Sequence, residues 1–155
     1  MTAAKIAALE LTERAETALG QYLQLHEQLF SWKNTFGWNQ YDALRQALLP
    51  LTEMTTDLVM AVETQAHTVQ QATSPDPLLA EYYRLLTKYV EFLKQAVQVM
   101  PKLLKQIEAK ARKTGTYKQA AYELDLAMYK QKVDMYQLHG QQLNALLPRL
   151  VASLR

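Results

Sequence analysis

The sequence predicts an all-α protein, an antiparallel up-down-up-down four-helix bundle with long, proline-bent helices. Three observations support this fold class. Apolar residues recur every three or four positions over four segments, short turns separate these segments, and one segment is apolar at more positions than a two-stranded coiled coil requires. We expect a single helical-bundle domain over residues 1–155, with helices at roughly 2–33, 40–72, 77–113 and 117–154.

The segment 77–113 has the most regular helical pattern. Its apolar series fills heptad positions a and d with Leu79, Tyr82, Leu86, Tyr89, Leu93, Ala96, Met100, Leu103 and Ile107. Positions e and g are also apolar, whereas a two-stranded coiled coil needs only a and d. The pattern therefore predicts that several neighbouring helices cover this one.

Turn residues indicate where the helices begin. Asp76 is placed to cap the third helix, and Pro77 suits the first helical position. Thr116 precedes Gln119 by three residues, a spacing that predicts a capping box at the start of the fourth helix.

Three prolines fall inside the predicted helices, at heptad positions that face outward: Pro50, Pro101 and Pro148. At such positions water can bond the carbonyl that loses its helical partner, so the helix bends rather than breaks. Pro50 leaves two alternatives open, because it could also divide its segment into two helices.

Composition excludes several classes of protein. The chain has 155 residues and no Cys, so disulfides, thiol catalysis and thiolate metal sites are excluded. The longest apolar run, 58–62, is too short for a transmembrane helix, and residues 1–5 do not resemble a signal peptide. We expect a cytoplasmic protein. A net charge of +2 does not favour nucleic acid as a partner.

Charge is divided unevenly between the two halves of the chain. Residues 1–75 carry 4 basic and 8 acidic side chains, and residues 76–155 carry 13 basic and 7 acidic ones. We interpret this asymmetry as an acidic half that docks on a basic half.

No pattern of catalytic, metal-binding or cofactor-binding residues emerges. Glu63 and His67 share a helical face, but that face points outward, and the chain lacks the Glu-x-x-His motif of di-iron bundles. The four glycines do not cluster into a phosphate-binding loop. We therefore predict a protein that is not an enzyme and binds no cofactor.

The last helix carries a second apolar stripe on the side opposite its core stripe. We call its larger members the outer row: Tyr117, Leu124, Met128, Met135 and Leu138. A four-helix bundle leaves this side in water, and exposed rows of Tyr, Leu and Met are typical of contact surfaces. The leading interpretation is a protein–protein interaction module that binds a partner or forms a homodimer through this row. Two alternatives remain: an N-terminal piece or a bent neighbouring helix covers the row, or the core and surface sides of this helix are partly reversed.

A second interpretation is a small apolar ligand held in a tyrosine-lined core cavity. Its wall would be formed by Tyr82, Tyr89, Tyr129 and Tyr136, with Gly140 leaving room for the ligand. The simpler alternative is that these tyrosines pack in the core with hydrogen-bonded hydroxyls, and that Gly140 permits close helix contact.

A third interpretation concerns the end of the bundle where the first and third turns meet. Aromatic and basic residues gather there: Trp32, Phe36, Trp38, Lys110, Arg112 and Lys113. Such a tip could touch an anionic membrane surface, as a peripheral contact, or a nucleic acid. It could equally be an apolar cap ringed by the lysines that commonly end helices.

Overall fold

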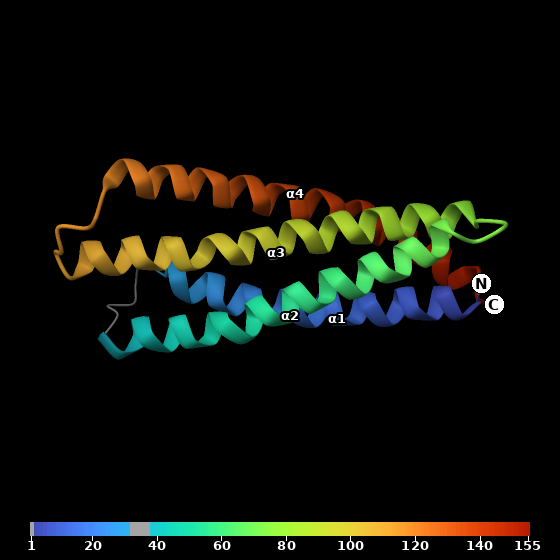
Figure 1. The fold of residues 1–155 in the computed structure, drawn as a ribbon, viewed down its shortest axis with the longest axis horizontal. Helices are drawn as coiled ribbons and strands as arrows, with labels where there is room; N and C mark the ends of the chain where they lie inside the picture. Colours follow the sequence, from blue (N-terminus) through green and yellow to red (C-terminus); the bar gives the residue numbers. More distant parts are fainter. Residues whose placement is uncertain (1, 32–37) are drawn as a thin grey trace.

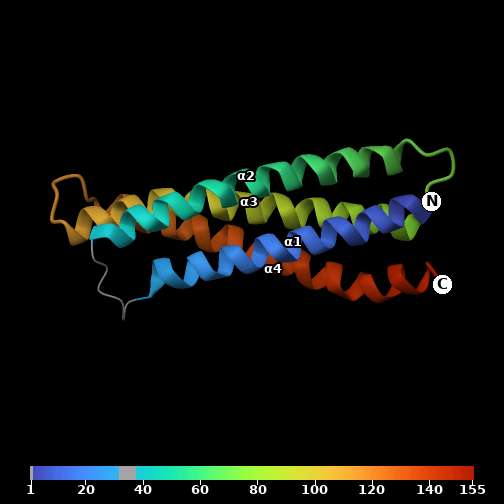
Figure 2. The same cartoon turned by 90° about the horizontal axis from the view of Figure 1, so that it is seen from below.

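The computed structural model describes residues 2–31 and 38–155, and within these ranges it contains four helices and no strand (Figure 1). The helices are α1 (Thr2–Phe30), α2 (Trp38–Gln70), α3 (Pro77–Ala111) and α4 (Gln119–Ala152). Successive helices run in opposite directions, and both chain ends lie at the same end of the bundle (Figures 1 and 2). The predicted all-α antiparallel four-helix bundle is confirmed.

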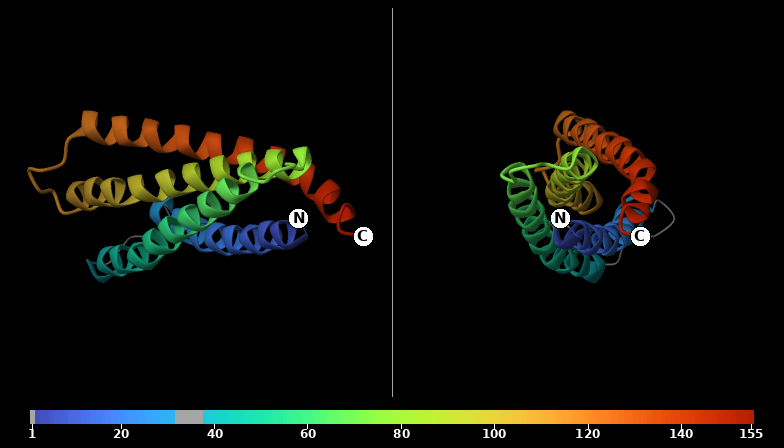
Figure 3. Two further views of the ribbon diagram at one scale, coloured as in Figure 1. Left: turned by 45° about the vertical axis from the view of Figure 1, so that its right-hand side comes forward. Right: turned by 90° about the vertical axis from the view of Figure 1, so that its right-hand side faces the viewer.

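Helix α3 occupies the centre of the bundle. It packs along its length against α2 and α4, and it also contacts α1 (Figure 3). The backbones of α1 and α4 approach each other at few points. The C-terminal end of α4 lies near the start of α1 (Figures 1 and 3). The bundle is therefore a central helix with three neighbours rather than a square of four.

The buried residues of α3 reproduce the predicted apolar series. Every member of the series from Leu79 to Leu103 is buried, and Ile107 is half-buried. Positions e and g add Tyr83, Leu85, Val90, Val97, Val99 and Leu104 to the core. So wide an apolar arc explains why α3 needs three neighbours to remove it from water.

The start of α3 is capped as predicted. The Asp76 carboxylate accepts hydrogen bonds from the backbone N–H groups of Leu78 and Leu79, at 2.9 and 3.4 Å, and Pro77 is the first helical residue. The Asp76 carboxylate also lies 3.5 Å from the Lys5 ammonium. Burial opposes ionisation of Asp76, but the backbone bonds and Lys5 together hold the pKa of this carboxyl below its usual value.

The predicted capping box of the fourth helix is wrong. Helix α4 begins at Gln119, and its N-cap is Lys118, whose side chain makes no capping bond. The Lys118 N–H instead donates to Oε1 of Gln106, on α3, at 3.2 Å, while the Thr116 hydroxyl bonds that of Thr114 at 2.7 Å. A side chain from the neighbouring helix thus replaces the local cap.

The three prolines lie inside continuous helices and are exposed, as predicted: Pro50 in α2, Pro101 in α3 and Pro148 in α4. Pro50 therefore does not divide its helix. An exposed proline leaves its unpaired carbonyl open to water, which makes the lost helical bond tolerable.

Ion pairs between the two halves of the chain do not follow the predicted charge division. Among the described residues, Lys5 pairs with Asp76 and Arg45 pairs with Glu108. Each pair joins a base of the acidic half to an acid of the basic half. The described pairs between the halves thus run against the predicted direction of charge.

We expect Asp76→Ala to lower the free energy of unfolding by about 1 kcal/mol, because two N–H groups of α3 lose their acceptor. Asp76→Asn should retain most of this stability, since Asn caps helices as well as Asp does. Urea denaturation of the three proteins at pH 7 measures the difference. The contribution of Asp76 to the free energy of unfolding should also decrease as the pH falls below 3.8, the ordinary pKa of an aspartate, because the carboxylate becomes protonated. The contribution of the asparagine in the variant Asp76→Asn should not depend on pH in this way. Equal losses in both variants would contradict the capping role.

Candidate functional site

The outer row of α4 reaches solvent in the structure. Leu124 is 63% exposed, Leu138 45% and Met128 39%, and Met135 is half-buried. Their spacing places them on one side of the helix. Four of the five residues predicted for the outer row thus share one surface of α4.

Tyr117 does not belong to this row. It lies in the connection before α4, where it is half-buried and its hydroxyl donates to Oε1 of Gln119. The Lys110 ammonium is 5.5 Å from the centroid of its ring. In the structure the outer row therefore consists of Leu124, Met128, Met135 and Leu138.

Helix α4 leaves this row outside because it rests on the bundle along a narrow stripe. Its fully buried residues are Tyr129, Tyr136, Leu143 and Leu150, one in each heptad. One side of α4 thus meets the core, and Leu124, Met128 and Leu138 on the opposite side are exposed.

Aromatic side chains join α1 to α4 where the two backbones stay apart. The Tyr129 hydroxyl bonds both the Tyr22 hydroxyl and Nδ1 of His26. The rings of Tyr22 and Tyr136 meet edge to face, with centroids 5.7 Å apart. The ring of Phe30 lies 4.9 Å from that of His26. We call these five residues the aromatic seam.

Burial favours the uncharged form of the polar groups in the aromatic seam. Burial raises the pKa of the Tyr22 and Tyr129 hydroxyls, and burial lowers the pKa of His26. No buried side-chain oxygen or nitrogen of the described residues lacks a hydrogen-bond partner. The seam therefore holds two helices together through satisfied, neutral hydrogen bonds.

The space beside Gly140 is filled by protein rather than open to a ligand. A Cβ atom at this position would lie 3.0 Å from the ring of Tyr89. That ring meets Tyr136 edge to face, with centroids 6.1 Å apart. Gly140 therefore permits α4 to pack closely on α3, the simpler of the two interpretations.

The other predicted cavity residues are also engaged by neighbours. Tyr82 is fully buried, and its hydroxyl bonds that of Thr12 at 2.7 Å. Tyr129 is the one predicted cavity residue that lines a described hollow, and that hollow lies at the surface. The predicted core site thus corresponds to packed tyrosines, with a surface groove beside them.

This α1–α4 groove has a volume of about 260 Å³. Its lining residues come from both helices: His26, Phe30, Leu126, Tyr129, Lys130, Val133 and Asp134. The heptad pattern does not identify Phe30, Lys130 or Asp134 as neighbours of His26. A heptad pattern assigns faces to each helix, but it does not show how far apart two helices stand.

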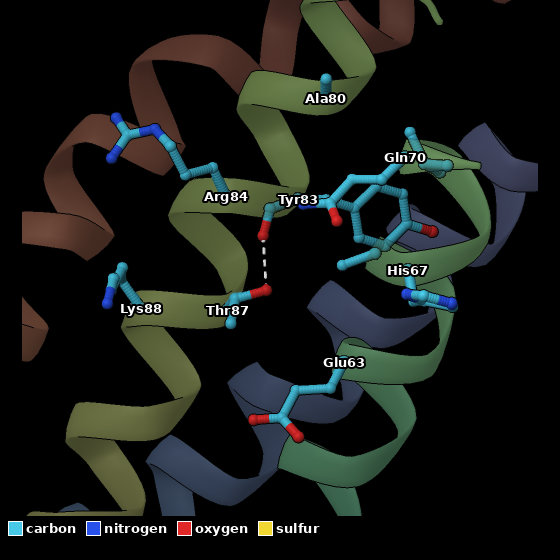
Figure 4. Close-up of a pocket in the computed structure, with 10 residues that line it drawn as sticks. Glu63, His67, Gln70, Ala80, Tyr83, Arg84, Thr87 and Lys88 are labelled. Carbon is cyan, nitrogen blue, oxygen red and sulfur yellow. Dashed lines mark hydrogen bonds between the residues drawn. The ribbon is translucent and has the colours of Figure 1, made fainter. Parts of the chain in front are cut away.

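A second hollow, of about 340 Å³, lies between α2 and α3. In Figure 4 the ring of Tyr83 lies between the two helices, and Thr87 donates a 2.7 Å hydrogen bond to the Tyr83 carbonyl. Arg84 and Lys88 point away from that ring (Figure 4). Arg84 forms an ion pair with Glu81, on its own helix.

Acidic and basic residues both lie at or beside this second hollow. Burial and a hydrogen bond with Glu63 raise the pKa of Glu91, and Lys88 lies 4.0 Å from the same carboxylate. His67 is exposed and lines the hollow with Glu63. No group of three or more metal-binding side chains is found among the described residues.

The predicted tip is described in part. Trp32 and Phe36 fall outside the described residues, and so does the side chain of Trp38. Lys110, Arg112 and Lys113 are exposed.

The cation of Arg112 already has partners within the protein. Its guanidinium lies 2.8 Å from the Glu108 carboxylate and 5.9 Å from the ring centroid of Tyr41.

None of the described helices is long and apolar enough to cross a membrane.

Comparisons of this chain with protein-family models, with curated proteins and with solved structures find no significant match.

Two glycines provide a matched test of the packing at Gly140. Gly20→Ala should raise the free energy of unfolding by about 0.5–1 kcal/mol, because alanine favours helix and nothing lies within 4 Å of the new methyl group. Gly140→Ala should yield a protein at least about 1 kcal/mol less stable than Gly20→Ala, since its methyl group meets the Tyr89 ring. Thermal and urea melts measure both. Equal stabilisation would show that Tyr89 moves freely.

Tyr129→Phe should lower the free energy of unfolding by about 1–3 kcal/mol, because Tyr22 and His26 lose their shared partner. Tyr122→Phe is the matched control, because this tyrosine of the same helix is half-buried and its hydroxyl has no described hydrogen bond to lose. Urea denaturation of the two variants distinguishes the loss of the hydrogen bonds to Tyr22 and His26 from the general effect of removing a tyrosine hydroxyl. Equal losses of stability in the two variants would contradict a structural role for the hydrogen bonds of Tyr129.

Proposed function

We propose that this chain is a non-catalytic helical module that binds a protein partner, in the simplest case a second copy of itself, through the outer row of α4. The observation that carries the proposal is the exposure of Leu124, Met128 and Leu138 on one side of a single helix. Grouped apolar side chains of this size commonly mark interaction surfaces. Met, with its flexible thioether chain, suits a surface that must adapt to a partner.

The other large apolar side chains that are exposed among the described residues are widely spaced. They are Ile6 and Leu23 on α1, Leu49 and Met60 on α2, and Val151 near the end of α4. Single exposed apolar residues are ordinary on soluble surfaces and need no partner. The grouping on α4, rather than exposure as such, distinguishes the outer row.

Polar residues interrupt the outer row, which supports a reversible contact. Gln131 lies between Met128 and Met135, and Gln142 follows Leu138 by one helical turn. A surface with these polar residues can be exposed to water again when the partner dissociates. The cysteine-free composition suits a reducing compartment, and we propose the cytoplasm as the location.

We expect Met128→Glu to weaken self-association at least about tenfold, because a carboxylate would be buried against an apolar partner surface. Light scattering over a range of protein concentrations measures the molar mass. Helicity and melting temperature should stay close to the native values, since Met128 lies outside the core.

Met60→Glu provides the matched control, because Met60 is 62% exposed on α2 and lies outside the outer row. It should leave the association unchanged. A native protein that remains monomeric at high concentration would exclude self-association. A Met128→Glu variant that loses its helical structure would show that this face belongs to the core.

A further inference from the structure

The α1–α4 groove lies on a different side of α4 from the outer row. The residues that α4 contributes to the groove follow helical spacing from Leu126 through Lys130 to Val133, and Leu124 and Met128 fall on another side. A volume of about 260 Å³ is below the roughly 300–1,000 Å³ of pockets for drug-sized ligands. The groove therefore suits a molecule built on one small ring system.

Three aromatic rings form the inner wall of the groove. The ring of Phe30 lies 4.9 Å from His26 and 5.5 Å from Tyr129, and the rings of His26 and Tyr129 are stacked with centroids 5.6 Å apart. Leu126 and Val133 complete the apolar lining. Rings at these distances favour a flat aromatic ligand, which can stack on some of them and meet others at an edge.

Two opposite charges stand at the groove, one helical turn apart. Lys130 and Asp134 are both exposed residues of its lining, and neither forms an ion pair within the described part of the chain. A base that precedes an acid by four residues is the less favourable order for a pair within a helix. Both charges are therefore available to a ligand that carries the complementary pair.

His26 leaves one polar atom for such a ligand. Its Nδ1 bonds the Tyr129 hydroxyl, and its other ring nitrogen has no partner among the described residues. Because a neutral imidazole has one donor and one acceptor, this second nitrogen can bond a polar atom of an aromatic ring.

We propose that the α1–α4 groove binds a free aromatic amino acid. The aromatic ring lies against Phe30 and Tyr129, the carboxylate meets Lys130, and the ammonium meets Asp134. This site is independent of the outer row, so the proposal does not depend on self-association.

Isothermal titration of the full chain with four compounds tests the proposal. L-tryptophan should bind most tightly. Tryptamine lacks the carboxylate and indole-3-propionate lacks the ammonium, so each should bind about three- to tenfold more weakly. L-leucine keeps both charges but has no ring, and it should bind weakest.

Substitutions in the groove measure separately the contributions of its two charges and of its aromatic wall to binding. Lys130→Gln and Asp134→Asn should each weaken binding of L-tryptophan about three- to tenfold, and Phe30→Leu, which keeps apolar volume, at least about tenfold. Glu53→Gln and Lys105→Gln remove exposed charges from α2 and α3 and should change nothing. Met128→Glu should also bind normally, because it alters the outer row alone.

Three outcomes would overturn the proposal. The first is the absence of binding heat at millimolar L-tryptophan. The second is equal affinity for L-leucine or for either truncated analogue, which would indicate an unspecific apolar groove. The third is protection of Phe30 and His26 in a homodimer, observed by NMR, which would make the groove an interface between copies of the chain.

Discussion

The wide apolar arc of α3 is the constraint on which the rest of the structure depends. With four apolar positions in each heptad, α3 is stable in water only when helices cover it from three directions. Helices α2 and α4 pack along it, and α1 reaches it from a third side. Helices α1 and α4 lie on different sides of α3, and their backbones approach each other at few points. The groove between them is a consequence of this arrangement.

Aromatic residues compensate for that separation. Aliphatic side chains are too short to join backbones that stand apart, but tyrosine can reach across and end in a hydrogen bond. The hydroxyls of Tyr22 and Tyr129 meet in this way, and His26 completes the chain. The same rings that stabilise the bundle also form the wall of the groove. Structural stability and a potential binding surface therefore share residues, while the outer row of α4 shares none with the core.

The fold could be predicted from the sequence because its signals are local. The series from Leu79 to Leu103, the Asp76 cap and the outward prolines each depend on residues close together in the chain. The site was less predictable because it depends on distances between helices. Gly140 fitted both an open cavity and a close contact, and only the position of Tyr89 decides between them. The start of α4 escaped prediction for a similar reason, because Gln106 of another helix supplies the acceptor.

The order of the helices has a consequence for folding kinetics. Each helix packs on the next one in the chain, so most of the contacts can form within hairpins that close short loops. The exceptions are the contacts of α1 with α3, such as the bond between Thr12 and Tyr82, and the aromatic seam. The seam joins the more distant positions, since Tyr22 and Tyr129 are 107 positions apart. We expect this seam to form after the three hairpins have assembled around α3. The last step of folding would then be the one that brings the two walls of the groove together.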